Sequence, residues 1–86
     1  MTDAEVIATH QAYADQHKRA FRVAFDCLTK LWPPKNDPEW FMNTAYPVCA
    51  AAYMENRENA LAREMVMMVF GYLERMAVAL DGDRHE

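Results

Sequence analysis

The fold is decided by residues 3–32, which read DAEVIATHQAYADQHKRAFRVAFDCLTKLW. At about 100° per residue this stretch has one apolar and one polar face, which predicts an amphipathic helix over 3–32. The apolar face carries Val6, His10, Tyr13, His17, Phe21, Ala24, Leu28 and Leu31. The polar face carries Asp15, Lys18, Arg19, Arg22, Asp26 and Lys30. Pro33 and Pro34 end the helix, because proline donates no backbone hydrogen bond and restricts the residue before it.

A second helix is predicted over 38–56. Asp37, Pro38 and Glu39 supply a capping acceptor, a proline at the first helical position and an acid near the positive end of the helix dipole. Pro47 removes one backbone hydrogen bond inside this helix and predicts a kink there. We expect one piece up to Ala45 and another from Pro47 to about Glu55.

The third helix is predicted over 59–80, with Asp81 and Gly82 at its end. Neither glycine nor proline stands between Val48 and Phe70, so one continuous helix is the alternative. The hydrophobic periodicity is unfavourable for one continuous helix, because the apolar face of the last helix, extended backwards, would carry Glu58 at its centre. A turn near 56–59, with Asn56 or Asn59 as the cap, restores the register.

These elements predict an all-α fold, an antiparallel three-helix bundle whose second helix is kinked at Pro47, in a single domain over residues 1–86. A chain of 86 residues buries only about 60–65% of its unfolded surface. Because 52% of the residues are hydrophobic, we expect a partner or a second copy of the chain to cover the excess. The first helix is the longest, and we expect its amino-terminal end to overhang and to supply a homodimer interface through Val6, His10, Tyr13 and His17.

The composition weighs against several partners and compartments. The net charge is −4, so a general phosphate-binding surface is not expected, and no direct nucleic-acid binding is predicted. No apolar run approaches the roughly 18–20 residues of a membrane span, and the acidic first residues do not resemble a signal peptide. We therefore expect a cytoplasmic protein in which Cys27 and Cys49 are reduced, with a single disulfide as the alternative.

The two histidines of the apolar face lie one heptad apart. That separates His10 and His17 by about 10 Å along the helix, which is too far for both to bind one metal ion. The usual helical ligand spacings are absent, so the common interpretation is a packed imidazole, and no metal site is predicted. A proton- or metal-responsive bundle, with His10 of one chain near His17 of another, is the functional alternative.

Aromatic and methionine side chains admit both a core and a binding interpretation. Aromatic residues gather around the first loop and the second helix, either as a hydrophobic plug or as an exposed anchor for a partner. They are Trp32, Trp40, Phe41, Tyr46 and Tyr53. In the third helix Met65, Met68 and Met76 are expected to fill the core, although methionine-rich surfaces also bind partners. The basic residues Lys18, Arg19 and Arg22 are expected to form a solvated face with neighbouring acids.

The chain lacks a glycine-rich phosphate loop, a nucleophile elbow and a paired metal motif, so neither enzyme activity nor a cofactor is expected. The sequence favours a non-catalytic protein–protein interaction or adaptor protein that acts as a homodimer and also binds another protein. The predicted interface residues are Val6, His10, Tyr13, His17, Trp32, Trp40 and Phe41. Two alternatives stay open: a small acidic inhibitor of phage or mobile-element type that blocks a larger, possibly nucleic-acid-handling, host-defence complex, and the proton- or metal-responsive bundle.

Overall fold

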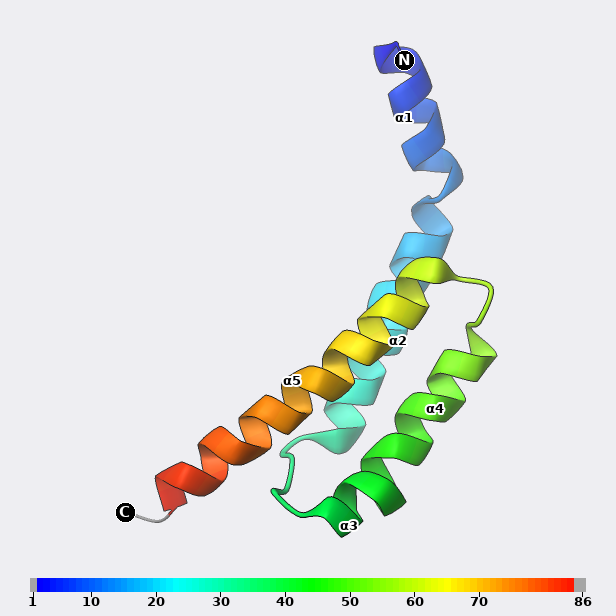
Figure 1. Cartoon of the computed structure of the whole chain (residues 1–86). Coiled ribbons are helices and arrows are strands. Elements are labelled where there is room, and N and C mark those ends of the chain that lie inside the picture. Colours follow the sequence, from blue (N-terminus) through cyan, green and yellow to red (C-terminus); the bar gives the residue numbers. More distant parts are fainter. Residues whose placement is uncertain (1, 85–86) are drawn as a thin grey trace.

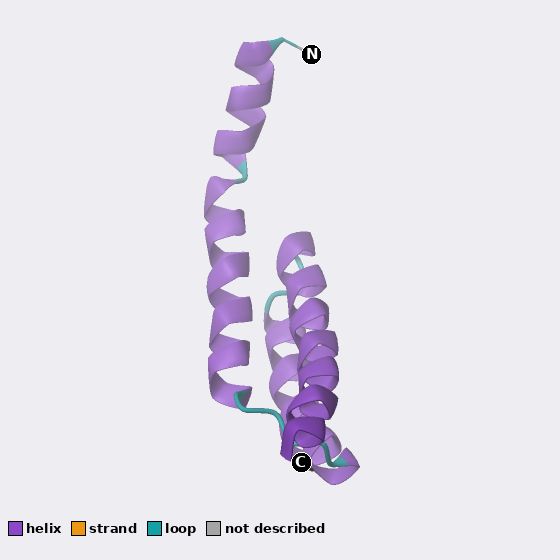
Figure 2. Ribbon diagram, turned by 90° about the vertical axis from the view of Figure 1, so that its left-hand side faces the viewer, coloured by secondary structure: helices purple, strands orange, loops and turns teal. Residues whose placement is uncertain are grey.

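The computed structural model describes residues 2–84, except for the side chains of His10, Asp83 and Arg84. Within this range all regular structure is helical and no strand is present, which confirms the all-α prediction (Figure 2). The elements are α1 (Asp3–Ala12), α2 (Ala14–Leu31), α3 (Pro38–Trp40), the π-helical turn η1 (Phe41–Ala45), α4 (Tyr46–Glu55) and α5 (Ala60–Arg84).

The first helical stretch is divided at Tyr13, where the sequence predicts one uninterrupted helix over 3–32. Tyr13 has φ −103° and ψ 3°, well away from α-helical values. Thr2 and Glu5 start α1 as a capping box, each side chain accepting a bond of 3.2 Å from the backbone N–H of the other. Because neither glycine nor proline marks Tyr13, the hydrophobic periodicity carries no signal for this break.

The second helical stretch changes its winding just before Pro47. Asp37 accepts a hydrogen bond of 3.1 Å from the Glu39 backbone N–H, and Pro38 follows at the first helical position, as predicted. Phe41–Ala45 then forms a π-helical turn, in which the carbonyl of Phe41 accepts the backbone N–H of Tyr46. The wider turn ends at Ala45, where the sequence predicts a division, and α4 begins at Tyr46.

A turn at 56–58 separates α4 from α5, so the predicted turn is confirmed and the continuous helix is wrong. Asn59 caps α5 by accepting the backbone N–H of Ala62 at 3.1 Å. The other end differs from the prediction, because α5 continues through Asp81 and Gly82 to Arg84. Asn36 in the first loop donates a hydrogen bond of 3.1 Å to the carboxylate of Asp81, which ties this part of α5 to the loop.

Helices α2, α4 and α5 pack side by side in an elongated molecule of 56 × 27 × 17 Å. Figure 1 shows α2 and α5 running in the same direction, with α4 running back between their ends. The most extensive packing joins α2 to α5, and α4 packs against α5 and α2. Figure 1 also shows α1 extending beyond the ends of α4 and α5, so the amino-terminal end overhangs as expected. Among the described residues, no helix is long and apolar enough to span a membrane.

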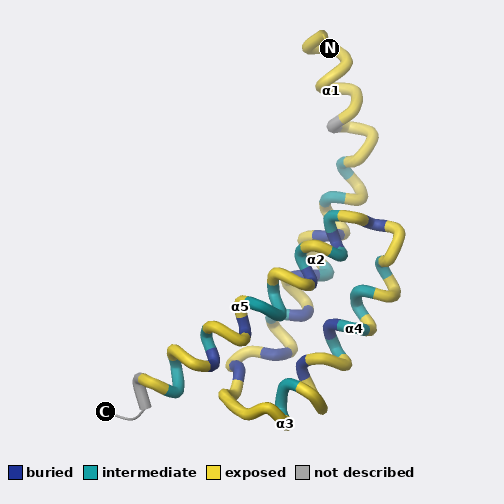
Figure 3. The backbone as a smooth tube through the Cα atoms, viewed as in Figure 1, coloured by how far each residue is buried: buried dark blue, intermediate teal, exposed yellow. Residues whose placement is uncertain are grey.

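Small side chains dominate the core. Five buried residues are alanines, which allow the helix backbones to approach closely, and they are Ala20, Ala24, Ala45, Ala62 and Ala77. Leu73 and Val66 are the largest fully buried side chains among the described residues. Figure 3 shows the buried positions on the facing sides of α2, α4 and α5, whereas α1 is exposed almost throughout. A core of this size leaves much of the chain's apolar surface in contact with solvent.

Candidate protein-interaction surface

Helix α2 has an apolar side that is too wide for its neighbours to cover. The small residues Ala20, Ala24 and Cys27 face α4 and α5 and are buried. The aromatic side chains lie on the adjoining flank, where Phe21 is 62% exposed and Phe25 is 67% exposed. The sequence predicts Phe21 within the apolar face that packs in the bundle. The structure leaves Phe21 exposed, because the smaller side chains permit the closer helix contact.

The same flank continues onto α5 through a stacked pair of aromatic rings. The ring centroids of Trp32 and Tyr72 lie 6.2 Å apart, with an angle of 16° between the ring planes. Met68 lies one turn before Tyr72 and is 67% exposed, although it was predicted to fill the core. We name this surface the aromatic–methionine face, and its members are Phe21, Phe25, Leu28, Trp32, Met65, Met68 and Tyr72.

The predicted amino-terminal interface is only partly assembled by the structure. Val6 is exposed on the overhanging α1. Tyr13 and His17 come together, with ring centroids 6.2 Å apart and planes inclined by 18°. The side chain of His10 lies outside the described part of the structure, so its relation to His17 stays a prediction.

Trp40 and Phe41, also predicted as interface residues, are half-buried and pack against the core. Their rings make an edge-to-face contact at 4.8 Å, and Phe41 makes a second one with Phe70 of α5 at 5.8 Å. Such contacts are typical of a hydrophobic plug between helices. Trp32 stacks on Tyr72 instead, so the predicted aromatic anchors fall into two separate contacts.

An apolar hollow, separate from the aromatic–methionine face, lies between α4 and α5. Tyr46 and Met54 from α4 line it together with Met67 from α5, and all three side chains are exposed. Tyr53 and Phe70 line the same hollow and are half-buried. This hollow contains fewer exposed aromatic rings than the aromatic–methionine face and does not extend onto α2.

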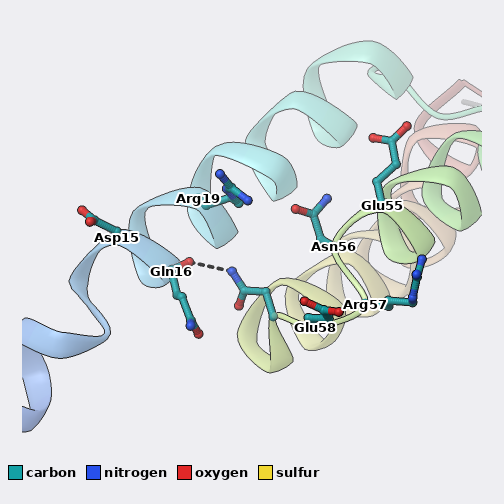
Figure 4. Close-up of a pocket in the computed structure, with 8 residues that line it drawn as sticks. Asp15, Gln16, Arg19, Glu55, Asn56, Arg57 and Glu58 are labelled. Atoms are coloured by element: carbon teal, nitrogen blue, oxygen red, sulfur yellow. Dashed lines mark hydrogen bonds between the residues drawn. The ribbon is translucent and has the colours of Figure 1, made fainter.

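A polar hollow separates α2 from the turn between α4 and α5 (Figure 4). Its lining mixes acidic and basic side chains from both sides. Figure 4 shows Asp15 and Arg57 at opposite ends of the hollow, with their charged groups directed away from each other. The hydrogen bond drawn across it joins Asn59 to the backbone carbonyl of Gln16, and it holds α5 against α2. The arrangement therefore fits a structural link better than a catalytic site.

The two cysteines meet in the core between α2 and α4. Cys27 and Cys49 are free, buried thiols, and a hydrogen bond joins their side chains. This bond lowers the pKa of Cys27 to about 7, with Lys30 adding to the decrease while burial and Asp26 oppose it. The same bond and burial raise the pKa of Cys49. Among residues 2–84 no group of three or more His, Cys, Asp or Glu side chains is placed to hold a metal ion.

No protein-family model, curated protein or solved structure matches this chain. The sequence-based interface omits Phe25, Met68 and Tyr72, which the structure places on the aromatic–methionine face. A signal for Phe25 exists, because Phe25 follows Phe21 by four residues and precedes Trp32 by seven, which puts all three on one flank of a helix.

Proposed function

We propose that the protein is a non-catalytic protein–protein interaction protein that acts as a homodimer through the aromatic–methionine face. The observation that carries the proposal is the exposure of Phe21, Phe25 and Met68 along one side of α2 and α5. Scattered single apolar residues are ordinary on a protein surface, whereas a contiguous set of aromatic and methionine side chains is typical of an interaction site. In the same proposal, α2, the 38–55 stretch and α5 form an antiparallel three-helix bundle kinked at Pro47.

The energetics favour covering this face. Full burial of one Phe or Met side chain stabilises a complex by about 1.5–3 kcal/mol. Association costs roughly 4–15 kcal/mol, so several such side chains must be covered together. A homodimer covers each of them twice, because a twofold contact uses the same surface on both copies. The overhanging α1, with Val6 and Tyr13 exposed, extends the surface on which a second copy can pack.

The test is a comparison of Phe25→Glu with Met42→Glu. Met42 is also exposed but lies in η1, outside the aromatic–methionine face. Both changes replace an exposed apolar side chain, so both variants are expected to keep the helical circular-dichroism spectrum of the wild type. Sedimentation at increasing dilution is expected to show monomeric Phe25→Glu and dimeric Met42→Glu. Equal association of both variants would remove the face from the proposal.

The inhibitor and the proton- or metal-responsive bundle stay as predictions. The inhibitor would use the same apolar face against a larger complex, and affinity capture from a host lysate would identify such a complex as the bound partner. The sensing bundle predicts that dimer mass changes between pH 7.5 and pH 5.5 or on addition of a chelator. We also propose a cytoplasmic location, on the composition described above.

A further inference from the structure

Two opposite charges stand at one edge of the aromatic–methionine face. Glu64 and Arg75 are both exposed on α5, and both line the shallow surface hollow that includes Met68 and Tyr72. They are eleven residues apart, which is close to three helical turns, so they lie on the same edge of the helix. Met68 and Tyr72 stand between them, each one turn or less from the midpoint near residue 70.

We propose that a second copy packs its α5 antiparallel on this α5, so that Glu64 of each copy faces Arg75 of the other. The inference rests on the proposed homodimer and adds the orientation and register of its two chains. A twofold axis perpendicular to the helices near residue 70 places each residue opposite one that is equally far on the other side of the axis. Met68 of one copy then meets Tyr72 of the other, in the middle of the contact.

Charge complementarity selects the antiparallel arrangement. If the two α5 helices ran in the same direction and in register, Glu64 would face Glu64 and Arg75 would face Arg75, and both pairs would repel. The antiparallel arrangement replaces the two repulsions by two attractions on the rim of an apolar contact. Rim charges of this kind determine register and orientation more than they add affinity.

Gly71 lies on the same edge of α5 as Glu64 and Arg75. It lies on α5 one turn before Arg75, and it lines the same hollow as Glu64. A Cβ atom at Gly71 would lie 3.5 Å from Nη1 of Arg75, so the guanidinium rests along the helix surface over the glycine. The edge that meets the second copy therefore carries no side chain at this position.

The arrangement also explains the length of α5. Trp32 lies level with Tyr72 through the ring stack, and α5 continues from there to Arg84. This continuation is roughly 18 Å long at 1.5 Å per residue. In the antiparallel dimer, Phe21 and Phe25 of one copy reach this part of α5 in the other copy, where Met76 is half-buried and Ala79 is exposed.

Charge reversal tests the register. We expect Glu64→Arg and Arg75→Glu each to weaken dimerisation about tenfold in sedimentation equilibrium at low salt, because each change disrupts two symmetric contacts. The double variant restores opposite charges across the contact and is expected to return to within about threefold of the wild type. The matched control is Glu74→Arg, which reverses an exposed charge on α5 away from the hollow and is expected to leave the dimer unchanged.

The possible outcomes separate the register from the proposed function. A wild-type monomer at all concentrations would overturn both the homodimer and its register. A wild-type dimer whose affinity responds equally to Glu64→Arg and Glu74→Arg would overturn the register and leave the homodimer standing. A double variant that dimerises as weakly as the single variants would also overturn the register, because the pairing of Glu64 with Arg75 requires mutual rescue.

Discussion

Asn59 joins the start of α5 to α2 through a single amide group. Its Nδ2 donates a hydrogen bond of 2.8 Å to the backbone carbonyl of Gln16, which lies 43 residues earlier in the chain. Its Oδ1 accepts the backbone N–H of Ala62 at 3.1 Å and so caps α5. With 7% of its surface exposed, Asn59 is a buried polar residue whose donor and acceptor are both used. One side chain therefore determines both where α5 begins and where it meets α2.

Asn59→Ala is expected to lower the free energy of unfolding by about 2 kcal/mol, because it removes a helix cap and a buried hydrogen bond together. Asn59→Ser keeps a capping acceptor but loses the donor to Gln16, and is expected to cost about half as much. Urea unfolding followed by circular dichroism measures both. Asn56→Ala is the control, since the side chain of Asn56 donates a hydrogen bond only to the nearby carbonyl of Ala52 in α4. A cost for Asn56→Ala equal to that of Asn59→Ala would contradict the linking role.

Substitutions at Leu73 and Met68 are expected to affect different properties, the first the stability of the fold and the second the association of two copies. Leu73 is fully buried, so Leu73→Ala is expected to destabilise the fold by about 2–5 kcal/mol through lost burial and a new cavity. Met68 is largely exposed, so Met68→Ala is expected to change monomer stability by less than about 0.5 kcal/mol. The same Met68 variant is expected to weaken the dimer. Thermal unfolding at low protein concentration, compared with sedimentation, distinguishes the two effects, and the reverse pattern would contradict the proposed division between core and interface.

The thiol pair predicts a pH dependence of stability. The folded protein releases the Cys27 proton at about pH 7, whereas the unfolded chain holds it until near the ordinary thiol pKa of about 8.5. Between these values the unfolded state binds more protons, so the free energy of unfolding rises with pH. At higher pH the raised pKa of Cys49 acts in the opposite direction, because the folded protein retains a proton that the unfolded chain has lost.

Denaturant titrations of the wild type and of Cys49→Ala at pH 7 and pH 8.5 measure this contribution. The Cys49→Ala variant lacks the hydrogen bond that lowers the pKa of Cys27, so the rise in stability attributable to the thiols is expected to disappear. An identical pH dependence in both proteins would show that the contact between the thiols does not govern their ionisation.

Contact between the thiols also predicts that a disulfide can join α2 to α4. Diamide accepts two electrons and two protons from a pair of thiols and becomes a hydrazine, leaving one S–S bond. We expect an intrachain Cys27–Cys49 link, detected as a loss of two hydrogen atoms by mass spectrometry. Closing this loop is expected to stabilise the fold by about 3 kcal/mol. Cross-linking only between chains would contradict the side-by-side placement of the two thiols. So would a failure of the folded protein to react.

Local chemistry explains which helix boundaries the sequence could predict. Asp37 with Pro38 marks a start by capping and by proline geometry, and the displaced phase around Glu58 marks the turn at 56–58. The break at Tyr13 has no such marker, because its residue type is compatible with a helix. The end of α5 was also missed, since Gly82 is accommodated within the helix and Asp81 is held by Asn36 from a distant loop.

The interaction surface was harder to predict than the fold. The apolar side of α2 is wider than the part that its neighbours cover, and periodicity alone gives only the average direction of that side. Ala20 and Ala24 determine which part of this side is buried. Helix α5 packs closely against their small side chains and leaves Phe21 and Phe25 outside. Tyr13 with His17 was correctly placed on one side, whereas Met68 was wrongly assigned to the core.

The central claim is that the exposed aromatic–methionine face holds two copies of the chain together. Multi-angle light scattering behind a sizing column, over a range of loading concentrations at neutral pH, measures the mass directly. The wild type is expected to have twice the chain mass of 10.0 kDa, and Phe25→Glu is expected to fall towards the monomer mass. A wild-type mass of 10.0 kDa at every concentration would contradict it.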